Sequence, residues 1–250
     1  MGEGGHRASV LLNMLLPPHC ALCGLASGSA PICGACRTGL PRAVEACTLC
    51  GLPLPPASGT LCGPCIRQRP PWDDCVSALL YRYPTRQLVR RFKFGRDLAC
   101  GAVLAGELLR AVRRRVGEPP QAIVPVPLHG TRQFTRSFNQ AELLAGPLAA
   151  DLGIPLETGL LRRARRTRAQ SGLDAVDRRR NTRGAFCCPP DGWPRGWSGG
   201  ARRPIYAHLA LVDDVMTTGA TLRECARVLH RAGVPRLSVW TAARAESPRA

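Results

Sequence analysis

Four Cys-x-x-Cys pairs lie between positions 20 and 65, and they restrict the folding of this chain more than any other feature. Each pair contains a glycine or is directly followed by one, as a tight turn needs when backbone N–H groups face thiolate sulfurs. Two such pairs supply the four thiolates of one tetrahedral Zn²⁺ site. The spacing therefore predicts a small module with up to two structural Zn²⁺ ions, held by Cys20, Cys23, Cys33, Cys36, Cys47, Cys50, Cys62 and Cys65.

Two other uses of paired cysteines compete with zinc. A disulfide framework requires an oxidising compartment, which nothing in the sequence indicates. A redox Cys-x-x-Cys motif typically occurs once beside a βαβ unit, and not four times in a Pro/Gly-rich segment. Sequential pairing of the four turns is the simplest, and interleaved pairing remains an alternative. Because large apolar side chains are few here, we expect metal to supply most of the folding free energy of a module over residues 1–70.

The segment from His208 to Thr221 is the second informative feature. An apolar run ends in two carboxylates, Asp213 and Asp214, and a hydroxyl-rich loop and a helical pattern follow. We expect a buried strand, exposed carboxylates at its end, a loop and an amphipathic helix. Such a loop presents N–H groups and a helix N-terminus to an anion. Adjacent carboxylates suit a ligand that also has hydroxyls or Mg²⁺, such as phosphoribosyl pyrophosphate (PRPP). The alternative is a solvated acidic turn.

Strands and helices alternate along the rest of the chain. Apolar periodicity predicts strands over 76–83, 122–128 and 237–241, and helices over 86–94, over 98–112 and from about residue 138. Residues 187–206 are expected to form a surface loop. This alternation predicts an α/β fold over residues 71–250, with a mainly parallel sheet and helices on both faces.

No apolar run has the length of a membrane span. The run Val10–Leu16 is too short, and no small-residue cleavage site follows it. We interpret it as a short helix that docks on the body of the protein, and we expect a cytoplasmic chain.

Arginine dominates the charge of the protein, which is +18 overall and includes a single lysine, Lys93. Such a charge favours anionic ligands, nucleic acid among them, without identifying one. Arg132 and Arg136 flank the loop after the strand at 122–128, where they either meet diphosphate oxygens or simply face solvent. Nine arginines between positions 162 and 183 form a mobile lid, a nucleic-acid-facing patch or a solvated helix face.

The Asp-Asp segment resembles the PRPP loop of type I phosphoribosyltransferases. Over nearly the whole chain, the sequence is similar to the ComF family (competence-associated and GntX-like), whose members carry an N-terminal zinc-ribbon module. The similarity rests on the cysteine pairs, on Phe92-Lys93-Phe94-Gly95, on residues 124–140, on a pattern from Thr167 through Gln170 to Phe186, and on the Asp-Asp loop. Ser137 stands where the family usually has glycine.

This resemblance implies a type I phosphoribosyltransferase fold that binds PRPP with Mg²⁺ and transfers the phosphoribosyl group to an unknown acceptor. Asp213, Asp214, Arg132 and Arg136 would be catalytic. PRPP would also contact Lys93, Gln170, Val215, Thr217, Thr218, Gly219, Ala220 and Thr221.

The resemblance further implies a role in DNA uptake, with single-stranded DNA or the uptake machinery as partner. A non-catalytic DNA-handling protein and a PRPP sensor remain alternatives. No Ser-His-Asp or Cys-His arrangement is evident, so His129 and His208 are expected to be incidental.

Overall fold

The structure, a computed structural model, describes residues 19–43, 45–115, 117–128, 138–165, 182–189 and 206–246. Several sequence predictions fall outside these residues. They are the helix over Val10–Leu16, Arg132 and Arg136, Gln170 with most of the arginine-rich stretch, and most of the loop at 187–206.

Four parallel strands form the central sheet, in the order β1-β6-β5-β2. They are β1 (Asp74–Leu80), β2 (Ala122–Pro125), β5 (His208–Met216) and β6 (Arg236–Arg244). Every pairing between neighbours in this sheet is parallel, so the carboxyl ends of the strands meet at one edge. The predicted parallel α/β sheet is therefore confirmed, and it has the form expected of a type I phosphoribosyltransferase fold. A separate antiparallel pair joins β3 (Arg162–Arg163) to β4 (Phe186–Cys187).

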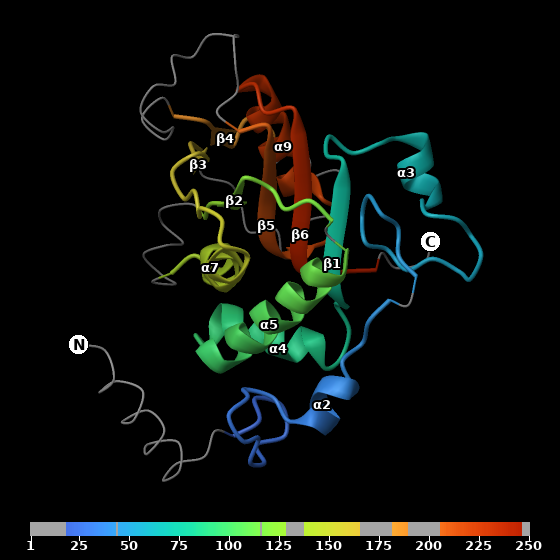
Figure 1. Cartoon of the computed structure of the whole chain (residues 1–250), viewed down its shortest axis with the longest axis vertical. Helices are drawn as coiled ribbons and strands as arrows, with labels where there is room; N and C mark the ends of the chain where they lie inside the picture. Colours follow the sequence, from blue (N-terminus) through green and yellow to red (C-terminus); the bar gives the residue numbers. More distant parts are fainter. Residues whose placement is uncertain are drawn as a thin grey trace.

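Helices cover both faces of the sheet, as predicted (Figure 1). On one face lie α4 (Thr85–Phe94), α5 (Leu98–Arg115) and α7 (Gln140–Leu152), and on the other lies α9 (Ala220–Arg231). Neighbouring residues of β5 enter different cores, because successive side chains of a strand point to opposite faces. Burial on both faces explains the continuous apolar runs that predict these strands.

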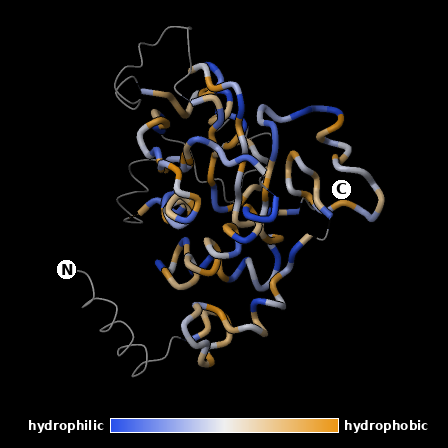
Figure 2. Tube along the Cα trace, in the orientation of Figure 1, coloured by the Kyte–Doolittle hydropathy of each residue, from blue (hydrophilic) through white to orange (hydrophobic). Residues whose placement is uncertain are grey.

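The two cysteine segments pack on different sides of the sheet domain. Ala21, Ile32 and Leu40 share a buried core with α4 and α5, whereas Cys47 and Leu49 share one with α9. Figure 1 accordingly shows α2 (Gly34–Thr38) beside α4 and α5, and α3 (Gly63–Arg67) on the far side of β1. In Figure 2, hydrophobic stretches run through the first cysteine segment as well as through the sheet. The boundary at residue 70 remains a prediction, but the segment draws stability from these shared cores in addition to metal.

The cysteine-rich part of the chain, from its first to its second segment, also covers part of the edge strand β1. The backbone N–H of Cys75 donates to the carbonyl of Thr48 over 2.7 Å, and that of Leu80 donates to the carbonyl of Pro41 over 2.8 Å. Backbone groups at an exposed sheet edge would otherwise be available to pair with another chain. The cysteine-rich segment thus accepts hydrogen bonds from backbone N–H groups on the outer edge of β1, where the described sheet has no further strand.

Candidate functional site

The two carboxylates lie inside β5 and not at its exposed end, which corrects the sequence prediction. The strand continues through Met216, which pairs with Arg244 of β6. Asp214 is only 8% exposed and Asp213 is partly buried. Because β5 pairs with β6 beyond the two acids, both acids lie within the sheet and are at least partly shielded from solvent.

Lys93 reaches the acid pair from the last turn of α4. Its Nζ lies 2.8 Å from Oδ1 of Asp214, and the backbone N–H of Asp214 donates to Oδ1 of Asp213 over 2.8 Å. Burial and the charge of Asp214 raise the pKa of Asp213 to about 7, against the opposing effect of Lys93. The structure thus brings together Lys93, Asp213 and Asp214, three residues that sequence reasoning had grouped only by family resemblance.

The loop after β5 turns sharply at Gly219. Its φ of 72° is left-handed, a conformation that glycine adopts without steric cost, and it caps the N-terminus of α9. No acidic residue lies in the first turn of α9, so the helix itself supplies no carboxylate there to offset the positive end of its dipole. Thr217 and Thr218 are at least partly exposed, while Gly219 and Ala220 are buried. This loop is therefore suited to accept an anion at its backbone N–H groups.

The remaining predicted contacts are divided between described and undescribed residues. The side chain of Val215 is partly buried and packs against the core. Thr221 lies in the first turn of α9 and is partly buried. Arg163, one of the nine arginines between positions 162 and 183, opposes the rise in the pKa of Asp213 through its charge. Arg132, Arg136 and Gln170 lie outside the described residues, so their roles remain predictions.

Arg244 is a residue that sequence reasoning missed. It ends β6, is 5% exposed, and donates to the backbone carbonyls of Met216 over 3.1 Å and Thr217 over 2.5 Å. Its guanidinium therefore holds the start of the loop that follows β5. An arginine directly after the apolar stretch 237–243 is the signal that would have indicated such a buried role.

The eight paired cysteines form two clusters, first with second pair and third with fourth, as the simplest pairing predicts. Within each cluster all four sulfurs lie within 4.8 Å of one another. The Sγ atoms of Cys23 and Cys33 are 3.9 Å apart and those of Cys50 and Cys62 are 3.5 Å apart, against about 3.8 Å for the edge of a zinc–thiolate tetrahedron. Both donor sets therefore fit structural zinc.

Backbone conformation divides the four turns into two kinds. Gly24 and Gly51 have φ values of 75° and 68°, so the turns they close need a left-handed residue. Gly34 and Gly63 instead begin the short helices α2 and α3. Each cluster therefore combines one glycine turn with one helix start.

The electrostatics of the clusters also favour a cation. Although burial acts to raise it, backbone N–H groups of Cys23 and Cys33 lower the pKa of Cys20 to about 6. A similar balance lowers the pKa of Cys47 to about 7. Burial and the charge of Cys50 raise the pKa of Cys65 well above its usual range. A metal ion among the sulfurs would relieve this crowding of like charges.

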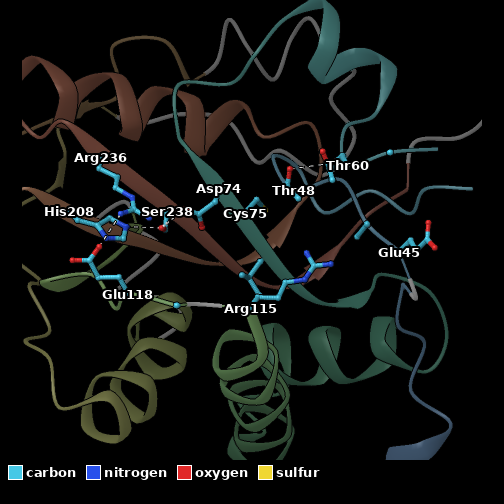
Figure 3. Close-up of a pocket in the computed structure, with 14 residues that line it drawn as sticks. Glu45, Thr48, Thr60, Asp74, Cys75, Arg115, Glu118, His208, Arg236 and Ser238 are labelled. Atoms are coloured by element: carbon cyan, nitrogen blue, oxygen red, sulfur yellow. Dashed lines mark hydrogen bonds and ion pairs between the residues drawn. The ribbon is translucent and has the colours of Figure 1, made fainter. Parts of the chain in front are cut away.

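A cavity of about 630 Å³ lies at the opposite, amino edge of the sheet, where β1, β5 and β6 begin (Figure 3). Nε2 of His208 lies 2.8 Å from Oγ of Ser238, and that Oγ donates to Oδ2 of Asp74 over 2.7 Å. A nucleophilic triad needs the imidazole between serine and carboxylate, and here the serine lies between the other two. Burial and Arg236 lower the pKa of His208. This chain of hydrogen bonds therefore does not form such a triad.

None of the helices in the described part of the chain has both the length and the apolarity that crossing a bilayer requires.

Comparison with known proteins extends the similarity over both parts of the chain. Residues 11–67 match the model of the double zinc ribbon domain. The chain is 36% identical over 239 residues to Competence protein F of Haemophilus influenzae, covering 91% of this chain and 93% of that protein. It is 37% identical over 234 residues to the DNA utilization protein YhgH of Salmonella typhi and 34% identical to that of Escherichia coli K12, each covering 91% of this chain and 97% of the relative.

Proposed function

The chain belongs to the ComF family, which includes Competence protein F and the YhgH proteins, and from this membership we propose that it binds PRPP with Mg²⁺ at the carboxyl edge of its sheet. The observation that carries the proposal is the acid pair, partly buried Asp213 and buried Asp214, directly before an anion-binding loop, with Lys93 ion-paired to Asp214. Carboxylates accept hydrogen bonds from ribose hydroxyls, while the loop N–H groups and the α9 dipole favour the 5-phosphate.

The acid pair also suits a magnesium ion. Carboxylate oxygens are preferred ligands of Mg²⁺, which is commonly bound by one or two of them together with substrate phosphates. Because burial favours the neutral form of Asp213, a bound cation would shift this group toward its charged form. The protein would therefore release protons when Mg²⁺ and PRPP bind near neutral pH.

If this site transfers the phosphoribosyl group, it would do so by electrostatic stabilisation, without a covalent enzyme intermediate. The bond from C1 of the ribose to pyrophosphate breaks through an oxocarbenium-like state, a bond to the acceptor forms, and the acceptor proton passes to solvent. Asp213 and Asp214 would orient the sugar, while Arg132 and Arg136 would offset charge on the departing pyrophosphate. Mg²⁺ would supply further charge neutralisation.

The names of the relatives support a physiological setting in DNA uptake or utilisation for this chain. Its net charge of +18 favours polyanions, which makes a non-catalytic DNA-handling protein the second candidate function. A PRPP sensor without turnover is a third. We also propose a cytoplasmic location, because reduced cysteines at zinc sites are typical of reducing compartments.

Calorimetry with PRPP and Mg²⁺ tests the proposal, with ribose 5-phosphate as the control ligand that lacks the diphosphate. We expect saturable, Mg²⁺-dependent binding that Asp213→Asn/Asp214→Asn removes. A pyrophosphate-release screen over nucleobases, amines and single-stranded DNA then identifies the acceptor. Binding without release would favour a sensor or a DNA-handling protein, and absence of PRPP binding to the zinc-loaded protein would refute the proposal.

A further inference from the structure

We propose that the second cysteine cluster (Cys47, Cys50, Cys62 and Cys65) holds the loop at 216–219 in its anion-binding conformation, with Arg244 and Trp72 as positioning residues between them. The consequence for PRPP rests on the proposed function. The mechanical connection does not, and it is measurable without any ligand.

Arg244 connects a zinc-ligand residue directly to the loop. Its Nε donates to the carbonyl of Cys50 over 2.7 Å, while its Nη1 donates to the carbonyls of Met216 and Thr217. Nη1 also donates to the carbonyl of Ala245. One planar guanidinium thus fixes two backbone segments at the same time. They are the zinc-binding turn Cys47–Cys50, here called the knuckle, and the loop at 216–219.

These contacts determine which way the loop amides point. In a trans peptide, the carbonyl and the N–H of the next residue point in opposite directions. Because Arg244 binds the carbonyls of Met216 and Thr217, the N–H groups of Thr217 and Thr218 point away from it. Arg244 therefore presents these two donors on the outer side of the loop, where an anion would accept from them.

Trp72 forms a second and independent connection. Its Nε1 donates over 2.6 Å to the carbonyl of Leu49, which lies between two ligand cysteines. Its ring packs against the turn of the loop, since a Cβ at Gly219 would lie 3.4 Å from that ring. The guanidinium carbon of Arg223 in α9 lies 5.5 Å from the ring centroid. The buried indole therefore links the knuckle to the loop and to the first turns of α9.

The charge of Arg244 gives the connection an electrostatic reason. Among the described residues, the acceptors of its hydrogen bonds are all backbone carbonyls, and the side chain is buried. A buried cation needs compensating negative charge. A Zn²⁺ ion with four thiolates carries net negative charge. Because Arg244 donates to the carbonyl of the ligand residue Cys50, this negative charge would lie close to its guanidinium. Loss of zinc would remove both the rigid knuckle and the counter-charge.

The first cluster provides a matched control within the same chain. It contacts the helices on the other face, where Arg91 of α4 donates to the carbonyl of Ala21 and Arg42 pairs with Glu107 of α5 over 2.5 Å. Loss of this cluster should therefore leave the loop at 216–219 unchanged.

Hydrogen exchange of the two amides that donate to loop carbonyls, Arg223 to Gly219 and Ala245 to Met216, measures the loop exchange and tests the connection in the full-length protein. Cys62→Ser and Cys23→Ser each remove one ligand, and zinc content verifies that each variant loses one ion. We expect loop exchange to be about tenfold faster in Cys62→Ser and unchanged in Cys23→Ser. Equal loop exchange in the two variants would overturn the proposal. Exchange at residues 209–212 in the centre of β5 shows whether the Cys62→Ser variant remains folded. If this variant unfolds, Arg244→Lys decides the question.

Arg244→Lys retains the charge and both clusters but loses the planar fork that reaches two backbones. For Arg244→Lys we expect full zinc content and loop exchange that is about tenfold faster than in wild type. Trp72→Phe should also accelerate loop exchange. Arg236→Lys, at the other end of β6, is the matched control and should behave as wild type. If Arg244→Lys leaves loop exchange unchanged, the connection is refuted.

PRPP affinity then separates the two proposals. Where wild type binds PRPP, Arg244→Lys should bind it about tenfold more weakly, and unchanged affinity would contradict the positioning role. Where wild type does not bind PRPP, the proposed function fails, but the exchange result still decides the connection.

Discussion

At the scale of single residues, the proposed site is defined by the environment of Asp213. This carboxyl group is partly buried, neighbours Asp214, and has a pKa raised to about 7. A carboxyl group with a raised pKa destabilises the folded protein once it ionises, because the unfolded chain ionises at lower pH. The unfolding free energy should therefore fall as pH rises from about 4 to 7 and level off above that range. Ionisable groups with shifted pKa values, which destabilise the free protein in this way, are common at binding sites.

Neutralising the acid pair should separate binding from stability. Asp213→Asn should raise the unfolding free energy at pH 8 by roughly 1 to 3 kcal/mol, because it removes the buried charge. Asp214→Asn should lower it by about 1 kcal/mol, because Lys93 loses its partner. The double variant should lose PRPP binding with little net change in stability. Denaturant unfolding at pH 5 and pH 8 measures the first effects, and normal PRPP binding by the double variant would refute the site.

PRPP binding should depend on pH through the same carboxyl group. Affinity for PRPP with Mg²⁺ should rise as pH increases through about 7, since the charged form of Asp213 is the form that binds cation and hydroxyls. Calorimetry in buffers of different ionisation enthalpy should show proton release near pH 6.5. Asp213→Asn should abolish that release, and release that persists in this variant would assign the proton to another group.

At the scale of elements, the strand–loop–helix unit from β5 to α9 concentrates the features that an anion site needs. β5 carries the carboxylates, Gly219 reverses the chain, and α9 contributes its N-terminus. The unit is fixed by its neighbours, because β6 pairs with the end of β5 and Trp72 packs against the turn. A short loop held on both sides loses little conformational entropy when a ligand binds.

Gly219→Ala should weaken both the fold and the site. A left-handed φ of 72° strains alanine, and its Cβ would contact the Trp72 ring at 3.4 Å. We expect a stability loss of about 1 to 2 kcal/mol and a clear loss of PRPP affinity. Gly153→Ala, at a left-handed position with open space after α7, is the control and should cost stability without changing affinity. Equal effects on affinity in both variants would argue against a specific loop conformation.

At the scale of the whole molecule, two cysteine clusters on opposite faces join the N-terminal segment to the sheet domain. The second cluster is buried throughout, whereas Cys23 of the first is exposed. The first joins the core under α4 and α5, and the second joins the core under α9. We therefore expect metal binding and sheet stability to be coupled in this chain, in contrast to an autonomous metal-dependent module.

Elemental analysis should find two Zn²⁺ per chain, and a chelator should remove them in two phases. The partly exposed first cluster should release its ion quickly, and the buried second cluster slowly, with loss of sheet stability. Chromogenic detection of released zinc alongside thermal unfolding measures both phases. A zinc content near zero in reduced protein, with mass data for disulfides, would refute the zinc assignment.

The arginine-rich stretch should distinguish a lid from a DNA surface. Arg165→Ala/Arg168→Ala should weaken PRPP binding if the stretch closes over the ligand. If it contacts single-stranded DNA, the same variant should flatten the salt dependence by about 0.7 in log–log slope per lost phosphate contact. We expect the first result, because Thr167 and Gln170 place hydrogen-bonding side chains among the charges. Unchanged binding of both ligands would assign the stretch to the solvated surface.

The sequence by itself determined the local features of this protein. Cysteine spacing specified two four-thiolate sites, and hydrophobic periodicity located β5, α5 and α9. Alternating strands and helices gave the parallel sheet, and the Asp-Asp loop gave the position of the candidate site. These features were predictable because each depends on residues close together in the chain.

Only the tertiary structure decided how these parts act on one another. The ion pair of Lys93 with Asp214 and the burial of Asp213 depend on α4 and β6. The contact of Arg244 with Cys50 joins residues 194 positions apart, and neither residue carries a local pattern that specifies the other. Burial, pKa and the packing of the two cysteine clusters are sums over such distant contacts. The physical reason is that periodicity and spacing encode local geometry, whereas the environment of a charge is set by whatever the fold brings against it.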